Sequence, residues 1–340
     1  MKAQFVRDHS HDRSVLSDVV PLSSPLSITV LAASICNLKC KYCVHGSGAP
    51  WLKEIQDKGF FFRLETAKQM IDGLKRSCEN GFPKLRRITY AGYGEPLLNP
   101  ELPEIIAYTK RSDVAEEVVV VTNAAALTPA LSDRLIEAEL DLLRVSIQGI
   151  TAEEYLEQCG RAVDIDQLVY SLRYYFEHKA VNQRLYVKIM EEQLKTAEEK
   201  QRFLEMFGDA CDEIAFESLA PVLANASAED AAQFEKGINT DSVAKVKLCP
   251  LPFYSLHVLT NGTVASCCYY DHAGFLGAVS EKSIQEIWES QEYAGFLRGM
   301  LASVKQGGAV CGGCKAYAYT MRGEDSLDRA LEKLCGALGV

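Results

Sequence analysis

The 340-residue sequence predicts an α/β fold: a partial (β/α)6 barrel followed by a small cysteine-rich unit. Short runs rich in Val, Ile and Leu alternate with helical periodicity between about residues 26 and 219, which is typical of βαβ units and a parallel sheet. After residue 247 the pattern changes to a hairpin and short helices with several cysteines. About six strand–helix units fit, fewer than a complete eightfold barrel needs.

The expected barrel strands are the apolar, β-branched runs at 26–32, 86–91, 117–122, 141–147, 185–190 and 213–217. Helical segments lie between them. Residues 64–78 repeat apolar side chains three and four positions apart, which marks one buried face. Thr128-Pro129 supplies a cap and first-turn pair for a helix near 129–139.

Four segments follow from these patterns: an N-terminal extension (1–24), the barrel (25–220), a linker (221–247) and a cysteine-rich domain (248–340). The linker is polar with only scattered apolar positions. In the last segment, Asn261-Gly262 separates two β-rich runs, 253–260 and 263–268, and predicts a hairpin with a primed turn. Short amphipathic helices are expected near 283–301 and 325–335.

Composition restricts the class of protein. The formal charge of −10 offers no basic surface for nucleic acid or an anionic membrane, so neither is an expected partner. The first 20 residues lack the apolar core of a signal peptide, and no apolar run approaches a membrane span. We therefore expect a cytoplasmic protein, in which twelve cysteines indicate metal or redox sites rather than disulfides.

Three cysteines, Cys36, Cys40 and Cys43, follow the first expected strand within eight residues. One short loop can aim three thiolates at an iron–sulfur cube, which leaves the fourth iron without a protein ligand. An open coordination position is typical of a catalytic metal site. A Cys3His zinc site that includes His45 is the alternative.

Polar groups follow the next three strands, at the edge where parallel α/β folds gather their working residues. The second strand ends in Ala91-Gly-Tyr-Gly-Glu-Pro96, the third in Thr122-Asn123 and the fourth in Ser146-Ile-Gln148-Gly. Glycines let the backbone approach a ligand, and a carboxylate can hold an amine. Together these loops predict a small-molecule site beside the cysteine loop.

The C-x3-C-x-Tyr-C loop and the Gly-Glu-Pro after the second strand resemble radical S-adenosylmethionine (radical SAM) enzymes over about residues 25–220. The resemblance implies that Cys36, Cys40 and Cys43 hold a [4Fe–4S] cluster whose open iron binds S-adenosylmethionine. Reductive cleavage then yields a 5′-deoxyadenosyl radical, with a flavodoxin- or ferredoxin-type protein as reductant. The implied cofactor contacts are Tyr42, Gly94, Glu95, Asn123, Ser146 and Gln148.

A second cysteine set comprises Cys249, Cys267, Cys268 and the pair Cys311-Gly-Gly-Cys314. Two pairs of thiols also fit a structural zinc ribbon. Beside a radical SAM core, the set resembles a twitch or shortened SPASM module, most like 2-deoxy-scyllo-inosamine dehydrogenase-type enzymes. That resemblance implies one auxiliary [4Fe–4S] cluster held by Cys249, Cys267, Cys311 and Cys314, with Cys268 as a substitute for Cys267.

A cluster closed by four thiolates suits electron transfer. The leading hypothesis is therefore dehydrogenation of a hydroxyl-bearing carbon in a sugar, aminoglycoside or cyclitol. The alternative is epimerisation, with Cys159 or Cys268 returning a hydrogen atom from the opposite face. Lys188 and Glu217, at the ends of the fifth and sixth strands, are candidate acid–base groups. Peptide modification, and a non-enzymatic electron carrier or zinc scaffold, remain open at this point.

Overall fold

The computed structural model describes residues 2–6, 13–220, 234–268, 274–306, 314 and 316–340. Six parallel strands form the barrel, as predicted: β2 (Ser27–Leu31), β3 (Leu85–Ala91), β4 (Ala115–Thr122), β5 (Leu142–Ile147), β6 (Arg184–Met190) and β7 (Glu213–Glu217). They differ from the expected ranges by a residue or two at their ends. The predicted partial-barrel fold is therefore confirmed.

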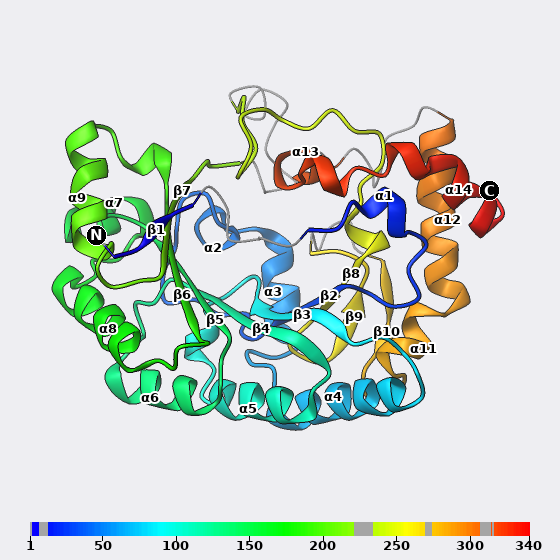
Figure 1. Cartoon of the computed structure of the whole chain (residues 1–340), viewed down its shortest axis with the longest axis horizontal. Helices are drawn as coiled ribbons and strands as arrows, with labels where there is room; N and C mark the ends of the chain where they lie inside the picture. The colour runs from blue at the N-terminus through cyan, green and yellow to red at the C-terminus, as the bar shows by residue number, and fades with distance from the viewer. Residues whose placement is uncertain (1, 7–12, 221–233, 269–273, 307–313, 315) are drawn as a thin grey trace.

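Helices pack along the outer face of this sheet (Figure 1). They are α4 (Leu64–Glu79), α5 (Leu102–Ser112), α6 (Pro129–Glu137), α8 (Ile165–His178) and α9 (Ala197–Phe207). The predicted helices at 64–78 and 129–139 are α4 and α6, and the Thr128 side chain caps α6 by accepting from Leu131 N–H. Fully buried side chains of both layers, such as Ile88, Val120, Met70 and Ile105, form the main core.

The second unit continues the same sheet instead of forming one of its own. The expected hairpin is present as β8 (Ser255–Val258) and β9 (Thr263–Ala265), with β10 (Phe275–Ala278) beyond it. However, β8 is also hydrogen-bonded in parallel to β2. The order is β1-β7-β6-β5-β4-β3-β2-β8-β9-β10. The predicted primed turn is wrong: Gly262 has φ +84°, but Asn261 does not have the positive φ that such a turn also requires, and the Gly262 N–H donates to the Leu259 carbonyl at 2.9 Å, so the turn spans Leu259–Gly262.

A smaller core joins the C-terminal helices to the segment that precedes β8. The C-terminal helices are α11 (Ile284–Trp288), α12 (Gln291–Lys305), α13 (Ala316–Thr320) and α14 (Leu331–Leu338). They include the helices expected near 283–301 and 325–335. Short 3-10 turns occur at η3 (Leu251–Phe253), η6 (Gly323–Asp325) and η7 (Asp328–Ala330). Leu248, Phe253, Leu301 and Leu334 are buried together. From the segment expected as a linker, residues 238 and 244 donate backbone hydrogen bonds to the α13 carbonyls of Tyr319 and Ala318.

The N-terminal extension contacts both edges of the barrel, which its sequence did not predict. Strand β1 (Gln4–Phe5) pairs in parallel with β7, whereas α1 (Leu16–Val19) lies beside the C-terminal helices (Figure 1). Arg13 forms an ion pair with Asp325, and Trp288 Nε1 donates to the Leu22 carbonyl at 3.2 Å. Among the described residues, no helix is long and apolar enough to cross a membrane.

Side chains alternate between the two faces of each barrel strand, and those on the inner face form layers. One layer is apolar and comprises Val119, Leu142, Tyr186 and Ala215, with Val6 packed against them. Toward the carboxyl edge follow Arg144, Lys188 and Glu217. Toward the amino edge lie Arg87, Glu117, Arg184 and Glu213, which form ion pairs. The barrel interior is therefore strongly polar on both sides of its apolar layer.

Candidate active site

The three-cysteine loop leaves the carboxyl end of β2 and runs into α2 (Val44–Ser47), which is followed by α3 (Pro50–Asp57). Leu38 N–H donates to Cys36 Sγ at 3.4 Å, and Cys43 N–H donates to the Cys40 carbonyl at 2.9 Å. Gly46 packs so closely that a Cβ there would lie 2.1 Å from the Cys40 oxygen. The loop's turn therefore depends on a glycine three residues after its last cysteine.

The loop fits an iron–sulfur cluster by the chemistry of its donors. All three thiols are free and partly exposed. Burial raises the pKa of Cys36 to about 12 and also raises the pKa of Cys43. Within the described ranges, no three Cys, His, Asp or Glu side chains are already drawn into metal-ligand geometry. A cluster bound here would displace the protons of the three thiols, as metal binding to thiols does.

Asn123, at the end of β4, contacts the cysteine loop directly. Its side-chain amide donates to Asn37 Oδ1 at 2.9 Å and approaches Cys36 Sγ at 3.7 Å. An amide beside a ligand sulfur stabilises negative charge on that sulfur. Asn123 is expected from the sequence as a cofactor contact; the structure places it against Cys36 and Asn37, and the contact with Asn37 was not predicted.

Glu95 is buried, with an exposed fraction of 2%, and its carboxylate connects the loop after β3 to the end of β4. Its carboxylate accepts from Thr122 Oγ1 at 2.5 Å, Asn123 N–H at 2.8 Å and Leu97 N–H at 3.0 Å, the last in η1 (Pro96–Leu98). Burial nevertheless raises its pKa. The neighbouring Gly94 fits beneath the β2 loop, where a Cβ would lie 2.1 Å from the Ala33 oxygen.

Two other expected cofactor contacts meet each other. The Tyr42 hydroxyl donates to Gln148 Oε1, and Gln148 Nε2 donates to the Ser146 carbonyl at 2.8 Å. The Gln148 N–H donates to the Tyr155 hydroxyl at 3.1 Å, on α7 (Ala152–Cys159). The cysteine loop is thus attached to the end of β5. His45, the ligand of the zinc alternative, is hydrogen-bonded to the Tyr93 carbonyl at 2.8 Å.

Cys159 ends α7 and lies against the cysteine loop. Its sulfur is 3.3 Å from Cys40 Sγ, and its carbonyl accepts from Lys39 N–H at 2.8 Å. The thiol contact raises the pKa of Cys40 above its usual range and lowers that of Cys159. Cys159 is fully buried in the main core. The residue expected as a hydrogen-atom donor at the barrel mouth therefore contacts a cysteine of the loop.

Lys188 and Glu217, expected as acid–base groups, form an ion pair inside the barrel. Lys188 Nζ is 3.0 Å from Glu217 Oε2, and Arg144 Nη2 is 2.5 Å from Glu217 Oε1. The Tyr186 hydroxyl donates to the same Oε1 at 3.1 Å. Burial lowers the pKa of Lys188, and Glu217 opposes this shift. Sequence reasoning missed Arg144, although it precedes Ser146 by two residues and so shares its face.

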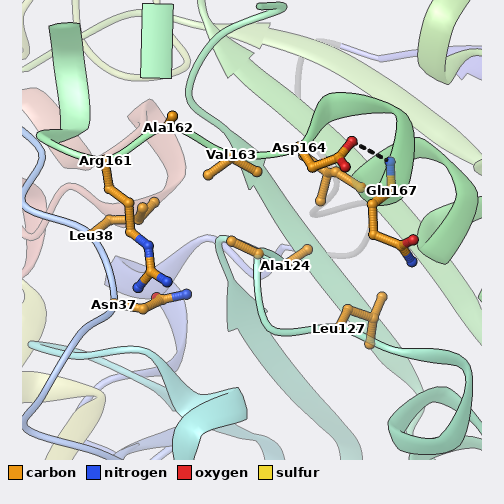
Figure 2. A pocket seen from close by; sticks show the side chains of 11 residues that line it. Asn37, Leu38, Ala124, Leu127, Arg161, Ala162, Val163, Asp164 and Gln167 are labelled. Carbon is orange, nitrogen blue, oxygen red and sulfur yellow. Dashed lines mark hydrogen bonds between the residues drawn. The ribbon is translucent and has the colours of Figure 1, made fainter. Parts of the chain in front are cut away.

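Arg161 also escaped the sequence analysis, although it follows Cys159-Gly160 in the same loop. Figure 2 shows its guanidinium directed toward the neighbouring Asn37, and both residues line a cavity of about 180 Å³. Leu38, Ala124 and Val163 line the same cavity. A cation therefore stands beside the cysteine loop at the carboxyl edge of the sheet, where it can bind an anionic group.

The second cysteine set lies at the amino ends of the parallel strands, opposite the three-cysteine loop (the amino edge of the sheet). Cys249 precedes β8, and Cys267 and Cys268 follow the antiparallel β9. Contact with the Cys267 thiol raises the pKa of Cys268. Burial raises the pKa of Cys314, and Cys267 adds to that shift. The structure thus brings Cys267 close to both neighbours and leaves the choice between Cys267 and Cys268 open. Cys311 lies outside the described residues.

A larger cavity of about 560 Å³ opens at this amino edge, between the barrel and the C-terminal unit. Its lining is polar and includes Thr89, Arg184, Glu117 and Tyr254. Burial raises the pKa of Tyr254, and Cys249 and Cys268 are close enough to add to the shift. The cavity therefore lies near the second cysteine set.

Family models match both parts of the chain. Residues 30–199 match the radical SAM superfamily, and residues 249–315 match SPASM, an iron–sulfur cluster-binding domain. Among curated relatives, GTP 3′,8-cyclase of Chlorobaculum tepidum is 30% identical over 147 residues, 40% of this chain and 39% of the relative. That of Corynebacterium glutamicum is 34% identical over 130 residues, 37% and 32%. The chain thus spans about two fifths or less of these relatives' length.

Solved structures share the fold at low sequence identity. BtrN in complex with AdoMet and 2-DOIA has a TM-score of 0.52 at 18% identity, covering 85% of this chain and 92% of that chain. SuiB of Streptococcus suis bound to S-adenosylmethionine gives 0.57 at 14%, covering 91% and 79%. From the family matches and the shared fold, we conclude that the chain belongs to the radical SAM superfamily, an enzyme family whose cofactors are S-adenosylmethionine and iron–sulfur clusters.

Proposed function

We propose that this enzyme oxidises a hydroxyl-bearing carbon of a sugar, aminoglycoside or cyclitol to a ketone. The observation that carries the proposal is the position of the two cysteine sets. Cys36, Cys40 and Cys43 follow the carboxyl end of β2, whereas Cys249 precedes β8, its parallel neighbour. The two sets are therefore separated by at least the length of β2, roughly 16 Å for five residues, with the polar barrel interior beside it.

The chain's residues suit a substrate held between these sets. The substrate would enter the barrel at the carboxyl edge, where Ser146, Lys188 and Arg144 offer polar groups near the three-cysteine loop. The 560 Å³ cavity lies on the amino side of the apolar layer, near the second cysteine set, and is not this site. In our proposal, S-adenosylmethionine bound at the three-cysteine loop supplies the radical that abstracts the hydrogen atom. The substrate radical then loses a proton and one electron, and Cys249, Cys267, Cys311 and Cys314 would hold the electron acceptor.

The cofactor roles of the carboxyl-edge residues are part of the proposal. Asn123 would stabilise the charge on Cys36, and Tyr42 and Gln148 would fix the loop against β5, beside Ser146. Gly94 and Glu95 would shape the edge that receives the methionine amine. Arg161 would pair with the carboxylate of S-adenosylmethionine. The hydrogen bonds from Asn123 to Asn37 and from Tyr42 to Gln148 support this arrangement.

Epimerisation through Cys159 is the second candidate. The 3.3 Å contact with Cys40 supports a role near the cluster, but full burial gives the thiol no surface toward a substrate. Cyclisation of a nucleotide, suggested by the names of the curated relatives, would concern only the part of the chain that they match. Peptide modification is the third candidate, and SuiB bound to the precursor peptide SuiA shares the fold.

The test uses anaerobically reconstituted protein with S-adenosylmethionine and dithionite. Wild type should form 5′-deoxyadenosine, and Cys40→Ala should not. Cys249→Ala should still cleave the cofactor but release no ketone. With a C-deuterated substrate, deuterium should appear in 5′-deoxyadenosine. Solvent deuterium in an unoxidised product, lost in Cys159→Ala, would instead establish epimerisation.

A further inference from the structure

Three charged side chains on the inner face of the barrel form a group with one excess cation. Arg144 on β5 and Lys188 on β6 both contact the carboxylate of Glu217 on β7, at 2.5 and 3.0 Å. Among the described residues, this is the one carboxylate within ion-pair distance of either cation. By contrast, the amino-edge layer balances Arg87 and Arg184 with Glu117 and Glu213.

The excess cation is largely removed from water. The exposed fractions of the Lys188, Glu217 and Arg144 side chains are 7%, 1% and 21%. Arg144 Nε is buried and has no hydrogen-bond partner in the described part of the chain. An uncompensated buried charge is costly, and so is an unsatisfied guanidinium N–H. The group therefore has both charge and hydrogen-bonding capacity for one more anion.

The group also lies at the right depth for a substrate. Ser146 and Lys188 are opposite each other in the β5–β6 register, as are Arg144 and Tyr186. Arg144 lies two residues, about 7 Å along the strand, below Ser146. Gln148, two residues above Ser146, contacts Tyr42 of the cysteine loop. An anion bound by Arg144 and Lys188 would thus lie one layer deeper than the residues proposed to contact the cofactor.

We propose that Arg144 and Lys188 bind an anionic substituent of the substrate, a phosphate or a carboxylate, with Glu217 as the positioning residue between them. This inference rests on the proposed function and narrows its substrate class. A guanidinium can bind either anion through two parallel hydrogen bonds, and an ammonium adds a point charge. The substrate would therefore be an acidic or phosphorylated polyol, and an amine at this position would be repelled.

Binding to the reconstituted, S-adenosylmethionine-loaded enzyme tests the proposal by calorimetry. The probes are inorganic phosphate and a matched series: glucose 6-phosphate, glucuronate, glucose and glucosamine. The phosphate or the carboxylate member should bind about tenfold or more tightly than glucose, because hydrogen bonds to charged groups are strong. Which of the two binds better identifies the anion.

Variants separate binding from folding. Lys188→Met and Arg144→Gln should each reduce the affinity for the anionic probe about tenfold or more. Lys188→Arg should largely restore it. Arg134→Gln, which removes an exposed cation paired with Glu104, should have no effect. Glu217→Gln keeps both cations and should strengthen anion binding while it destabilises the fold; a purely structural network would not strengthen it.

Several results would overturn the inference. These are equal binding of glucose or glucosamine, no measurable binding of any anionic probe, or unchanged anion affinity in Lys188→Met. A raised KM for S-adenosylmethionine in the Arg144 or Lys188 variants would assign the group to the cofactor instead. Formation of 5′-deoxyadenosine is measured separately. A protein that does not cleave S-adenosylmethionine is thus distinguished from one that cleaves it but does not bind the anionic probes.

Discussion

The pH dependence of the free energy of unfolding tests the pairing of β8 with β2, because the buried His257 lies at this pairing. It lies on β8 opposite Thr29 of β2 and is buried, with an exposed fraction of 9%. Burial lowers its pKa to about 4. The folded protein therefore holds this imidazole neutral, whereas the unfolded chain protonates it near pH 6.5.

The sign of the effect follows from proton linkage. Between pH 6.5 and 4 the unfolded state binds more protons at His257 than the folded state, so stability falls as the pH is lowered. The full difference is about 3 kcal/mol, from roughly 2.5 pKa units at 1.36 kcal/mol each. Between pH 7.5 and 5.5, where iron–sulfur proteins are easier to handle, the expected loss is about 1.4 kcal/mol.

The assay compares wild type with His257→Gln by urea unfolding under anaerobic conditions at pH 7.5, 6.5 and 5.5. The glutamine side chain of this variant cannot titrate, so its free energy of unfolding should fall by about 1.4 kcal/mol less than that of wild type. Changes common to both proteins, including cluster loss, cancel in this difference. His178→Gln is the control, since that ring is exposed on α8. Parallel pH profiles for wild type and His257→Gln would refute the reasoning.

Three other substitutions test the site. Glu217→Gln should lower the free energy of unfolding by about 3–5 kcal/mol, because it leaves two buried cations together. In a double-mutant cycle measured by urea unfolding, adding Lys188→Met should restore much of the lost stability. Additive losses would contradict the pairing. Gly94→Ala should cost about 1–3 kcal/mol in thermal unfolding because its Cβ would overlap the Ala33 carbonyl, whereas Gly299→Ala, with open space around it, should not. Asn123→Leu should retain the iron but shift the cluster potential negative in an EPR redox titration, since it removes a donor beside Cys36; an unchanged potential would exclude that role.

The sequence was most informative where a local pattern determines the structure. The six barrel strands, the Thr128 cap of α6 and the β8–β9 hairpin depend on residues within a few positions of one another. The cysteine loop was predictable for the same reason, because its spacing and the preceding strand are contiguous. Its attachment to Gln148, 106 residues away, was expected only as two separate cofactor contacts.

Contacts between distant segments were not predictable. Nothing in residues 253–260 indicates that this strand pairs with β2 as well as with its hairpin partner. Likewise, Lys188 and Glu217 look like independent strand-end charges in the sequence. Their ion pair, and the second cation from Arg144, depend on the register of three strands that are far apart along the chain.

The pairing of β8 with β2 has a functional consequence. Because the two strands are parallel neighbours, the segment before β8 and the loop after β2 are held at opposite edges of one rigid sheet. The distance between the two cysteine sets is therefore fixed by strand length instead of by a flexible linker. Loss of one set should leave the other in place, so Cys249→Ala is expected to retain cofactor cleavage and Cys40→Ala to retain the auxiliary iron. If either substitution removed both sets of iron, the two edges would be coupled through folding and the sheet would not act as a spacer.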